Sequence, residues 1–157
     1  MTLPSDPVAR FAEIGAEIAE RVERVLSGWV AAQVTSVAEA WGRLDPKTRS
    51  GLDASVVAVG PVVAVRIAAE LRTMAALPVA DQVVTPLQIV RGATADVTAL
   101  LEGVGIPPIE RDAFEERAFP ADRYGATPAS LADLGDPDLG PLQLAWGLAK
   151  VQVLRQG

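Results

Sequence analysis

The chain has 157 residues, of which 50% are hydrophobic and only 4% aromatic, and its formal net charge is −6. It contains no cysteine and no histidine. Their absence excludes disulfides, catalytic triads built on Cys or His, and metal sites with thiolate or imidazole ligands. The acidic balance, with Lys47 and Lys150 as the only lysines, argues against nucleic acid, because nucleic acid is bound through cations that neutralise phosphates. The length and hydrophobic content predict a single domain with an aliphatic core.

The N-terminal segment, from Pro7 to about Leu44, is predicted to form one long helix. Ser5 or Asp6 can cap it, and Pro7 suits its first turn. Two stripes of apolar residues run along it at spacings of three and four, and a bend is expected where the first gives way to the second, near Ser27. The first stripe comprises Phe11, Ile14, Ile18, Val22, Val25 and Trp29, and the second comprises Leu26, Val30, Val34, Val37, Trp41 and Leu44.

The next segment is the most apolar of the chain. A short helix or turn is expected over 45–51, and a longer helix over 53–76. The valines of the longer helix lie all round a helical wheel, which predicts a helix buried on all sides. Pro61 should kink this helix or mark its start. A strand is the alternative for the β-branched run, although no other segment is strand-like enough to pair with it.

The second half of the chain is punctuated by proline. Residues 78–157 contain eight of the twelve prolines and are predicted to form shorter helices joined by rigid connectors. These helices are expected over 86–103, 110–118, 128–134 and 142–154. The fold class is therefore all-α: one helical bundle spanning 1–157, in which a long N-terminal helix and an apolar central helix (1–77) form the scaffold for the Pro-rich short helices (78–157).

No segment is predicted to cross a membrane. Residues 1–7 lack the basic start and apolar core of a secretory signal. The longest apolar stretch, 54–65, has twelve residues, whereas a bilayer span needs about twenty. We expect a soluble, cytoplasmic protein that interacts neither with membranes nor with nucleic acid. The excess of arginine over lysine is typical of a GC-rich bacterial genome.

Acidic residues are concentrated in 102–138, where nine acids and three arginines give −6, the charge of the whole chain. This segment either faces a basic partner or hard cation, or is simply solvated. Within it, Asp136 and Asp138 alternate like calcium ligands, but the glutamate that an EF-hand requires at position twelve is missing. Glu17 and Glu20 form an E-x-x-E pair without a companion E-x-x-D. No catalytic, cofactor-binding or metal-binding residue is therefore assigned.

Association is the predicted function. The two long apolar helices supply more apolar surface than a domain of this size easily covers. We predict a non-enzymatic protein that forms a homodimer or binds another protein as an adaptor, with the N-terminal helix at the interface. Its candidate interface residues are Phe11, Ile14, Ile18, Val22, Val25, Trp29 and Trp41.

Two alternatives remain beside association. The helices could enclose an apolar, Val- and Ala-lined pocket for a small molecule, with Arg66 or Arg91 at its mouth. A less favoured alternative is a magnesium-dependent hydrolase built on the helical acids. The single tyrosine, Tyr124, is expected to pack a loop onto the core rather than to bind a ligand.

Overall fold

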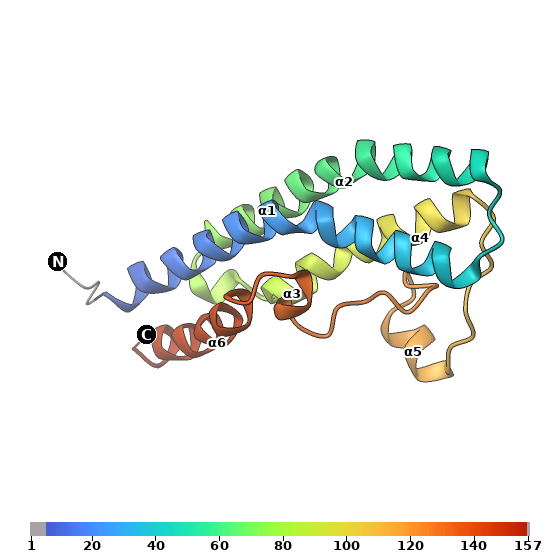
Figure 1. The fold of residues 1–157 in the computed structure, drawn as a ribbon. Helices are drawn as coiled ribbons and strands as arrows, with labels where there is room; N and C mark the ends of the chain where they lie inside the picture. The colour runs from blue at the N-terminus through green and yellow to red at the C-terminus, as the bar shows by residue number, and fades with distance from the viewer. Residues whose placement is uncertain (1–5, 157) are drawn as a thin grey trace.

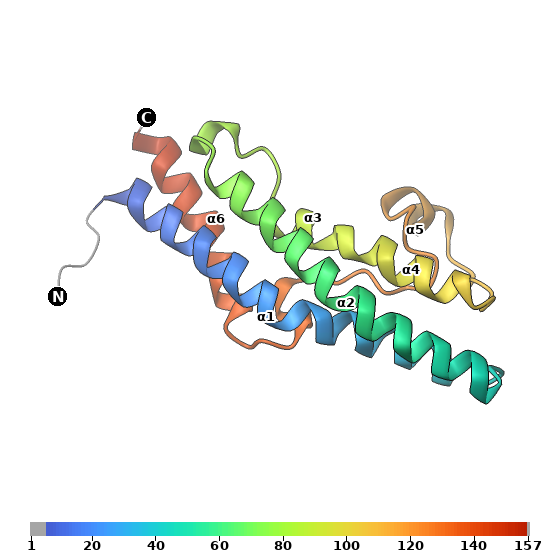
Figure 2. The ribbon, with the colours of Figure 1, turned by 90° about the horizontal axis from the view of Figure 1, so that it is seen from above.

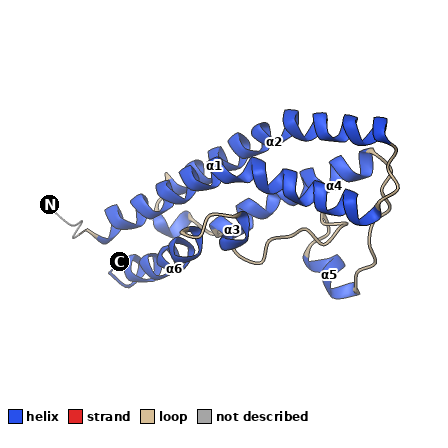
Figure 3. Ribbon diagram, in the orientation of Figure 1, coloured by secondary structure: helices blue, strands red, loops and turns tan. Residues whose placement is uncertain are grey.

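The computed structural model describes residues 6–156 and is 75% helical, with no strand among those residues (Figure 3). Two long helices lie side by side along the whole molecule, and the shorter elements cover one side of the pair (Figure 1). The all-α prediction is confirmed. The helices are α1 (Pro7–Trp41), α2 (Pro46–Ala75), α3 (Pro86–Val90), α4 (Thr94–Gly103), α5 (Ala113–Ala118) and α6 (Leu139–Gln156), with short 3-10 turns η1 (Val79–Asp81), η2 (Arg91–Ala93) and η3 (Leu131–Leu134).

Helix α1 follows the predicted segment closely. The Asp6 carboxylate caps it by accepting a hydrogen bond from the Val8 amide at 3.0 Å. The helix is continuous through Ser27. It ends at Trp41, before the expected Leu44, because Gly42 adopts a left-handed conformation with φ of +66° and its amide bonds back to the Ala38 carbonyl.

Helix α2 differs from its prediction, since the expected break after 45–51 is wrong. Asp45 caps the helix through the Thr48 amide and hydroxyl, at 2.8 and 2.9 Å, and one helix then runs to Ala75. Gly51 keeps a helical conformation there and faces open space, so nothing forces the helix to end. Pro61 also lies inside the helix, and the ribbon of α2 changes direction near its middle (Figure 1).

The expectation that α2 is buried on all sides is also wrong. One face, which includes Val63, Ile67 and Leu71, is buried mainly against α1. The opposite face is exposed, because the neighbours of α2 all lie on the other side of the helix. A helical wheel reports that a helix is apolar all round, but it does not say whether the fold provides enough partners to cover it.

One glycine lies at the contact between α1 and α2. Gly60 is buried, and a Cβ built on it would lie 2.6 Å from the Ser27 hydroxyl oxygen of α1. A carbon cannot approach an oxygen that closely, so the absence of a side chain at position 60 lets the Ser27 hydroxyl keep its place in the contact between the two helices.

Helix α6 closes the core at the other end of α1. It runs antiparallel to the N-terminal half of α1 (Figure 2), and the rings of Phe11 and Trp146 lie 5.4 Å apart between their centroids. The core therefore extends from α2 through α1 to α6. Its largest fully buried side chains include Ile18, Val22, Leu26, Val30, Ile67, Leu71, Leu101, Leu131 and Leu139.

Candidate functional site

The seven candidate interface residues lie on the side of α1 that packs within the chain. Five of them are buried in the chain's own core, namely Phe11, Ile14, Ile18, Val22 and Trp29. Val25 and Trp41 are half-buried and pack against the same core. In the single chain these side chains serve packing, and apart from Val8 the exposed large apolar side chains lie outside α1.

The first exposed apolar surface is the outer face of α2, which we call the α2 face. It comprises Ala54, Val57, Ala58, Pro61, Val62 and Val65, all exposed. The three valines have exposed fractions of 76%, 64% and 60%, in chain order. From Ala54 to Val65 the chain carries no charged residue. The all-round apolar wheel of this helix was part of the predicted excess of apolar surface, but the helix itself was expected to be buried and the interface was placed on the N-terminal helix.

The second exposed apolar surface lies on α6 and was not predicted. Leu144, Leu148, Val151 and Leu154 are each at least 45% exposed. Their spacings of four, three and three place them on one side of the helix, opposite Trp146. That spacing was available in the sequence and could have identified this surface.

Within residues 6–156, α2 is the one helix long and apolar enough to cross a membrane. Its most apolar window of 18 residues has a mean hydropathy of 1.8, and 39% of that window is buried in this fold. A bilayer span needs about twenty residues, which the whole of α2 provides and the stretch 54–65 alone does not. Length and composition are also met by core helices of soluble proteins, so this finding defines α2 as unusually apolar and nothing more.

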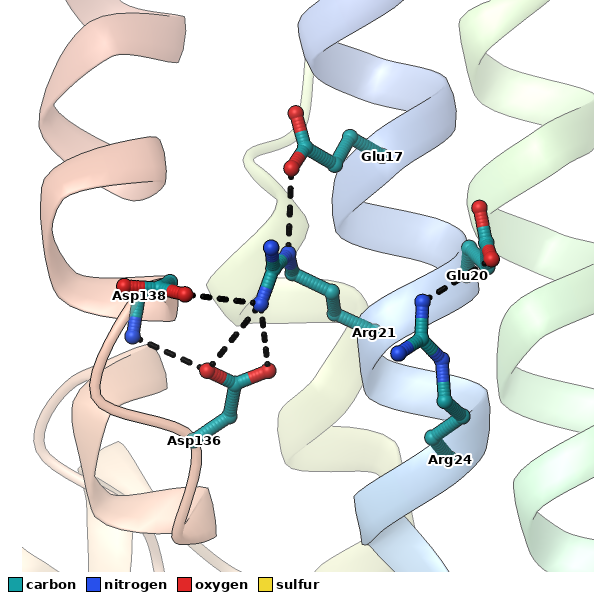
Figure 4. A network of polar contacts seen from close by, with 6 residues as sticks. All are labelled: Glu17, Glu20, Arg21, Arg24, Asp136 and Asp138. Carbon is teal, nitrogen blue, oxygen red and sulfur yellow. Dashed lines mark hydrogen bonds and ion pairs between the residues drawn. The ribbon is translucent and has the colours of Figure 1, made fainter.

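The acids that were weighed as metal ligands take part in ion pairs instead (Figure 4). Arg21 donates from Nε to Glu17 at 3.1 Å and from Nη1 to Asp136 and Asp138, at 3.1 and 3.0 Å. The Asp138 amide and the Arg21 guanidinium both stabilise the charged Asp136 carboxylate, which lowers its pKa. The bonds of Arg21 to Asp136 and Asp138 tie α1 to the start of α6, whereas the neighbouring Arg24–Glu20 pair at 2.9 Å lies within α1.

In the described part of the chain, no three or more acidic side chains come together in a way that could hold a metal ion. Glu17 pairs with Arg21, whereas Glu20 pairs with Arg24, so the two glutamates of the E-x-x-E pair do not converge. The geometry gives the magnesium-hydrolase alternative no support. The protein is a helical protein without a metal-binding cluster among residues 6–156.

Arg91, one of the two arginines predicted at a pocket mouth, lines a cavity of about 340 Å³ between α3, α4 and the loop after α5. Its Nε donates to the Pro128 carbonyl at 3.0 Å, and its guanidinium carbon lies 5.1 Å from the centre of the Phe119 ring. Thr94 also lines the cavity, and its buried hydroxyl has no hydrogen-bond partner among residues 6–156. We call this cavity the Arg91 pocket.

Arg66, the other predicted arginine, lines a more apolar groove of about 470 Å³ at the C-terminal end of α2. Its wall includes Ala69, Met74, Leu77, Val83 and Val84, together with Glu70 and Asp81. Arg66 forms an ion pair with Asp96 of α4. This groove therefore has aliphatic walls, as expected, but its cation is already neutralised within the chain.

The loop between α5 and η3 is held by a buried acid. Asp122 accepts hydrogen bonds from the amides of Tyr124, Ala126 and Thr127 and from the Thr127 hydroxyl, at 2.7–3.0 Å. Burial acts to raise the pKa of Asp122, but these hydrogen bonds outweigh it and lower the pKa. Tyr124 is buried, and its hydroxyl donates to the Ile106 carbonyl. The loop is thus fixed against α4, as expected for Tyr124.

The chain was compared with models of protein families, with curated proteins and with solved structures, and none of these comparisons yields a match.

Proposed function

We propose that the protein acts by association, and that its partner is a second copy of the same chain bound through the α2 face. The observation that carries this proposal is the exposure of Val57, Val62 and Val65 on one side of a 30-residue helix. Aliphatic side chains of this size each gain about 1.5–3 kcal/mol when fully buried, so covering them is strongly favourable. Contiguous exposed apolar surface of this kind is typical of association sites.

Charge favours a second copy as the partner. The chain carries −6, so two copies repel each other wherever their acidic surfaces approach. The α2 face has no charged residue, and the charges at its two ends are already neutralised by the Arg49–Asp53 and Arg66–Asp96 pairs. Two such faces can meet without bringing like charges together, which is what a two-fold interface between identical surfaces requires.

This proposal moves the predicted interface from α1 to α2. The apolar stripe of α1 is already covered by α2 and α6 within one chain, so using it for a dimer would require opening the core. The α2 face needs no such rearrangement, since its valines are exposed in the folded monomer. The function proposed is therefore that of a homodimeric helical protein, with α1 supporting the interface helix from behind.

The test is the mass of the protein in solution, measured by sedimentation velocity over a range of micromolar concentrations. We expect wild type at twice 16.4 kDa and Val62→Asp at 16.4 kDa, with unchanged circular dichroism. Leu148→Asp is the matched control, because it places the same charge on the exposed face of α6, and it should remain a dimer. Its dissociation alone would move the interface to α6.

A monomeric wild type would contradict the proposal. The same sample is therefore also sedimented with vesicles of phosphatidylcholine and phosphatidylglycerol. A monomer that binds these vesicles, and loses that binding in Val62→Asp, would assign the α2 face to lipid rather than to a second copy. A wild-type dimer whose mass is unaffected by Val62→Asp would equally reject the α2 face.

A further inference from the structure

We infer that the Arg91 pocket binds a small organic monocarboxylate, with the carboxylate paired to the Arg91 guanidinium and the apolar body against Phe119 and Pro120. This inference does not depend on the proposed dimer, because no residue of the α2 face lines the pocket. It rests on the cation, the buried hydroxyl, the charge balance and the volume of the cavity.

The first support is an arginine held in place without a counter-ion. Arg91 is half-buried, with its Nε bonded to the Pro128 carbonyl and its guanidinium beside the Phe119 ring. Among residues 6–156 it forms no ion pair, whereas Arg21 and Arg66 are each paired with aspartates. A guanidinium fixed through Nε and a ring face keeps its terminal nitrogens for a planar, two-oxygen partner, and a carboxylate has that geometry.

The second support is the buried hydroxyl of Thr94, another residue of the pocket wall. Its Oγ1 has no hydrogen-bond partner among the described residues, although the side chain is almost fully buried. A buried polar group without a partner is destabilising, so a partner supplied from the pocket would offset that cost. Thr94 lies three positions after Arg91, so both side chains project from the same side of the η2–α4 segment.

The charge balance limits the ligand to one negative charge. Asp122 also lines the pocket, but it forms no ion pair with Arg91, and its two oxygens accept four hydrogen bonds from Tyr124, Ala126 and Thr127. Its charge remains nearby, and no lysine lines the pocket. Asp122 would therefore repel a phosphate dianion about twice as strongly as a carboxylate, which carries one charge.

The size and wall of the cavity define the rest of the ligand. A volume of about 340 Å³ is at the small end for ligand pockets, which span roughly 300–1,000 Å³. The rest of the wall includes Ala118, Phe119, Pro120 and Ala121, which offer apolar contact. A short aliphatic or single-ring body fits this description.

The experiment is a titration of the wild-type chain with phenylacetate and hexanoate, followed by amide chemical shifts in ¹⁵N NMR spectra. The matched probes are phenylacetamide and hexanamide, which have the same bodies without the charge. We expect saturable shifts centred on Gly92, Ala118, Ala121 and Thr127, with the amides binding at least tenfold more weakly. The inference is overturned if neither acid gives saturable shifts there, or if acids and amides bind equally well.

Two variants test whether Arg91 is the residue that recognises the charge of the ligand. Arg91→Gln should weaken phenylacetate binding at least tenfold, while Arg117→Gln, which removes an exposed arginine from neighbouring α5, should leave it unchanged. Equal affinity of Arg91→Gln and wild type would reject the assignment. If Arg91→Gln does not fold, the comparison of acid and amide on the wild-type chain still tests whether the pocket recognises a carboxylate.

Thr94→Val is the second variant, chosen because it keeps the side-chain shape. Removing a buried hydroxyl without a partner should raise the melting temperature. If Thr94 contributes to the site, the same variant should weaken phenylacetate binding. Higher stability with unchanged affinity would remove Thr94 from the site, and the carboxylate would then be recognised through Arg91 alone.

Discussion

Arg21 of α1 donates from one nitrogen, Nη1, to both carboxylate oxygens of Asp136, at 3.1 and 3.3 Å, across 115 positions of the sequence. Both side chains are mostly covered, with exposed fractions of 24% and 13%, so water screens this pair less than it screens the other ion pairs of α1. The contact fixes the chain entering α6 relative to α1 (Figure 4).

Arg21→Gln should therefore lower the melting temperature, because the variant leaves Asp136 without its cation. Arg24→Gln is the control: within residues 6–156 Arg24 pairs with Glu20 alone, four positions earlier on the same exposed helix face, and its loss should change stability little. Thermal unfolding followed by circular dichroism measures both variants. Equal melting temperatures for the two variants would show that Arg21 contributes no more than a surface pair.

Gly60→Ala should gain less stability than its helix propensity alone would give. The new Cβ would lie 2.6 Å from the Ser27 hydroxyl oxygen, so the Ser27 side chain must rotate, and an unfavourable rotamer costs about 0.5–1.5 kcal/mol. Removing that oxygen should abolish this cost, so Ser27→Ala with Gly60→Ala is expected to be at least as stable as wild type. Denaturant unfolding of the four proteins in this cycle should yield a coupling energy of about 0.5–1.5 kcal/mol.

Gly28→Ala is the control for this cycle, since a Cβ at position 28 meets nothing within 4 Å. It should stabilise α1 by up to about 1 kcal/mol through helix propensity alone. A Gly60→Ala variant that gains stability in the same way would mean that the Ser27 side chain rotates at this crossing without penalty.

The pKa of Tyr124 should lie above the ordinary value for a tyrosine. Burial raises the pKa of its phenol, and the negative charge of Glu102 adds to the effect. Because the folded pKa lies above the unfolded value of about 10, the stabilisation is fully present below pH 10 and is lost as the pH rises through the folded pKa. Tyr124 is the only tyrosine, so tyrosinate absorbance reports it alone.

Tyr124→Phe tests the same contact at neutral pH. It leaves the Ile106 carbonyl without its buried donor, which should cost about 1 kcal/mol in free energy of unfolding. The variant should also lose part of the alkaline dependence of stability. A native titration midpoint equal to that of the denatured chain would show that the phenol is open to water.

The prediction from the sequence was most accurate for α1, where a single apolar face determines which side of the helix is buried. Phe11 to Trp29 recur at helical spacing beside a polar face, and α1 was located to within a few residues because that pattern has one interpretation. The same reasoning failed on α2. Gly51 was interpreted as a boundary, and Pro61 as a kink or a helix start. The helix continues through both, so the boundary at Gly51 and the start at Pro61 are wrong, because its cap at Asp45 and its packing on α1 outweigh local propensity.

The pockets show a different limit of sequence reasoning. Arg66 or Arg91 was expected at a pocket mouth, and each lines a pocket, yet only the fold shows that Asp96 neutralises the first while the second has no ion pair among residues 6–156. Composition could not reveal this difference, since Arg66 and Asp96 are thirty positions apart. Likewise, Asp122 counted as one of many acids until the loop placed three amides around it.

The antiparallel contact of α1 with α6 sets an order for the biosynthesis of the fold. Helix α2 follows α1 directly in the chain, so their hairpin can form as soon as residue 75 has emerged from the ribosome. The Phe11 ring must wait for Trp146, and closing that long loop carries the largest entropic penalty. The docking of α6 is thus the step that removes the N-terminal half of the core from water. A nascent chain that stalls before α6 would present the apolar side of α1 to chaperones.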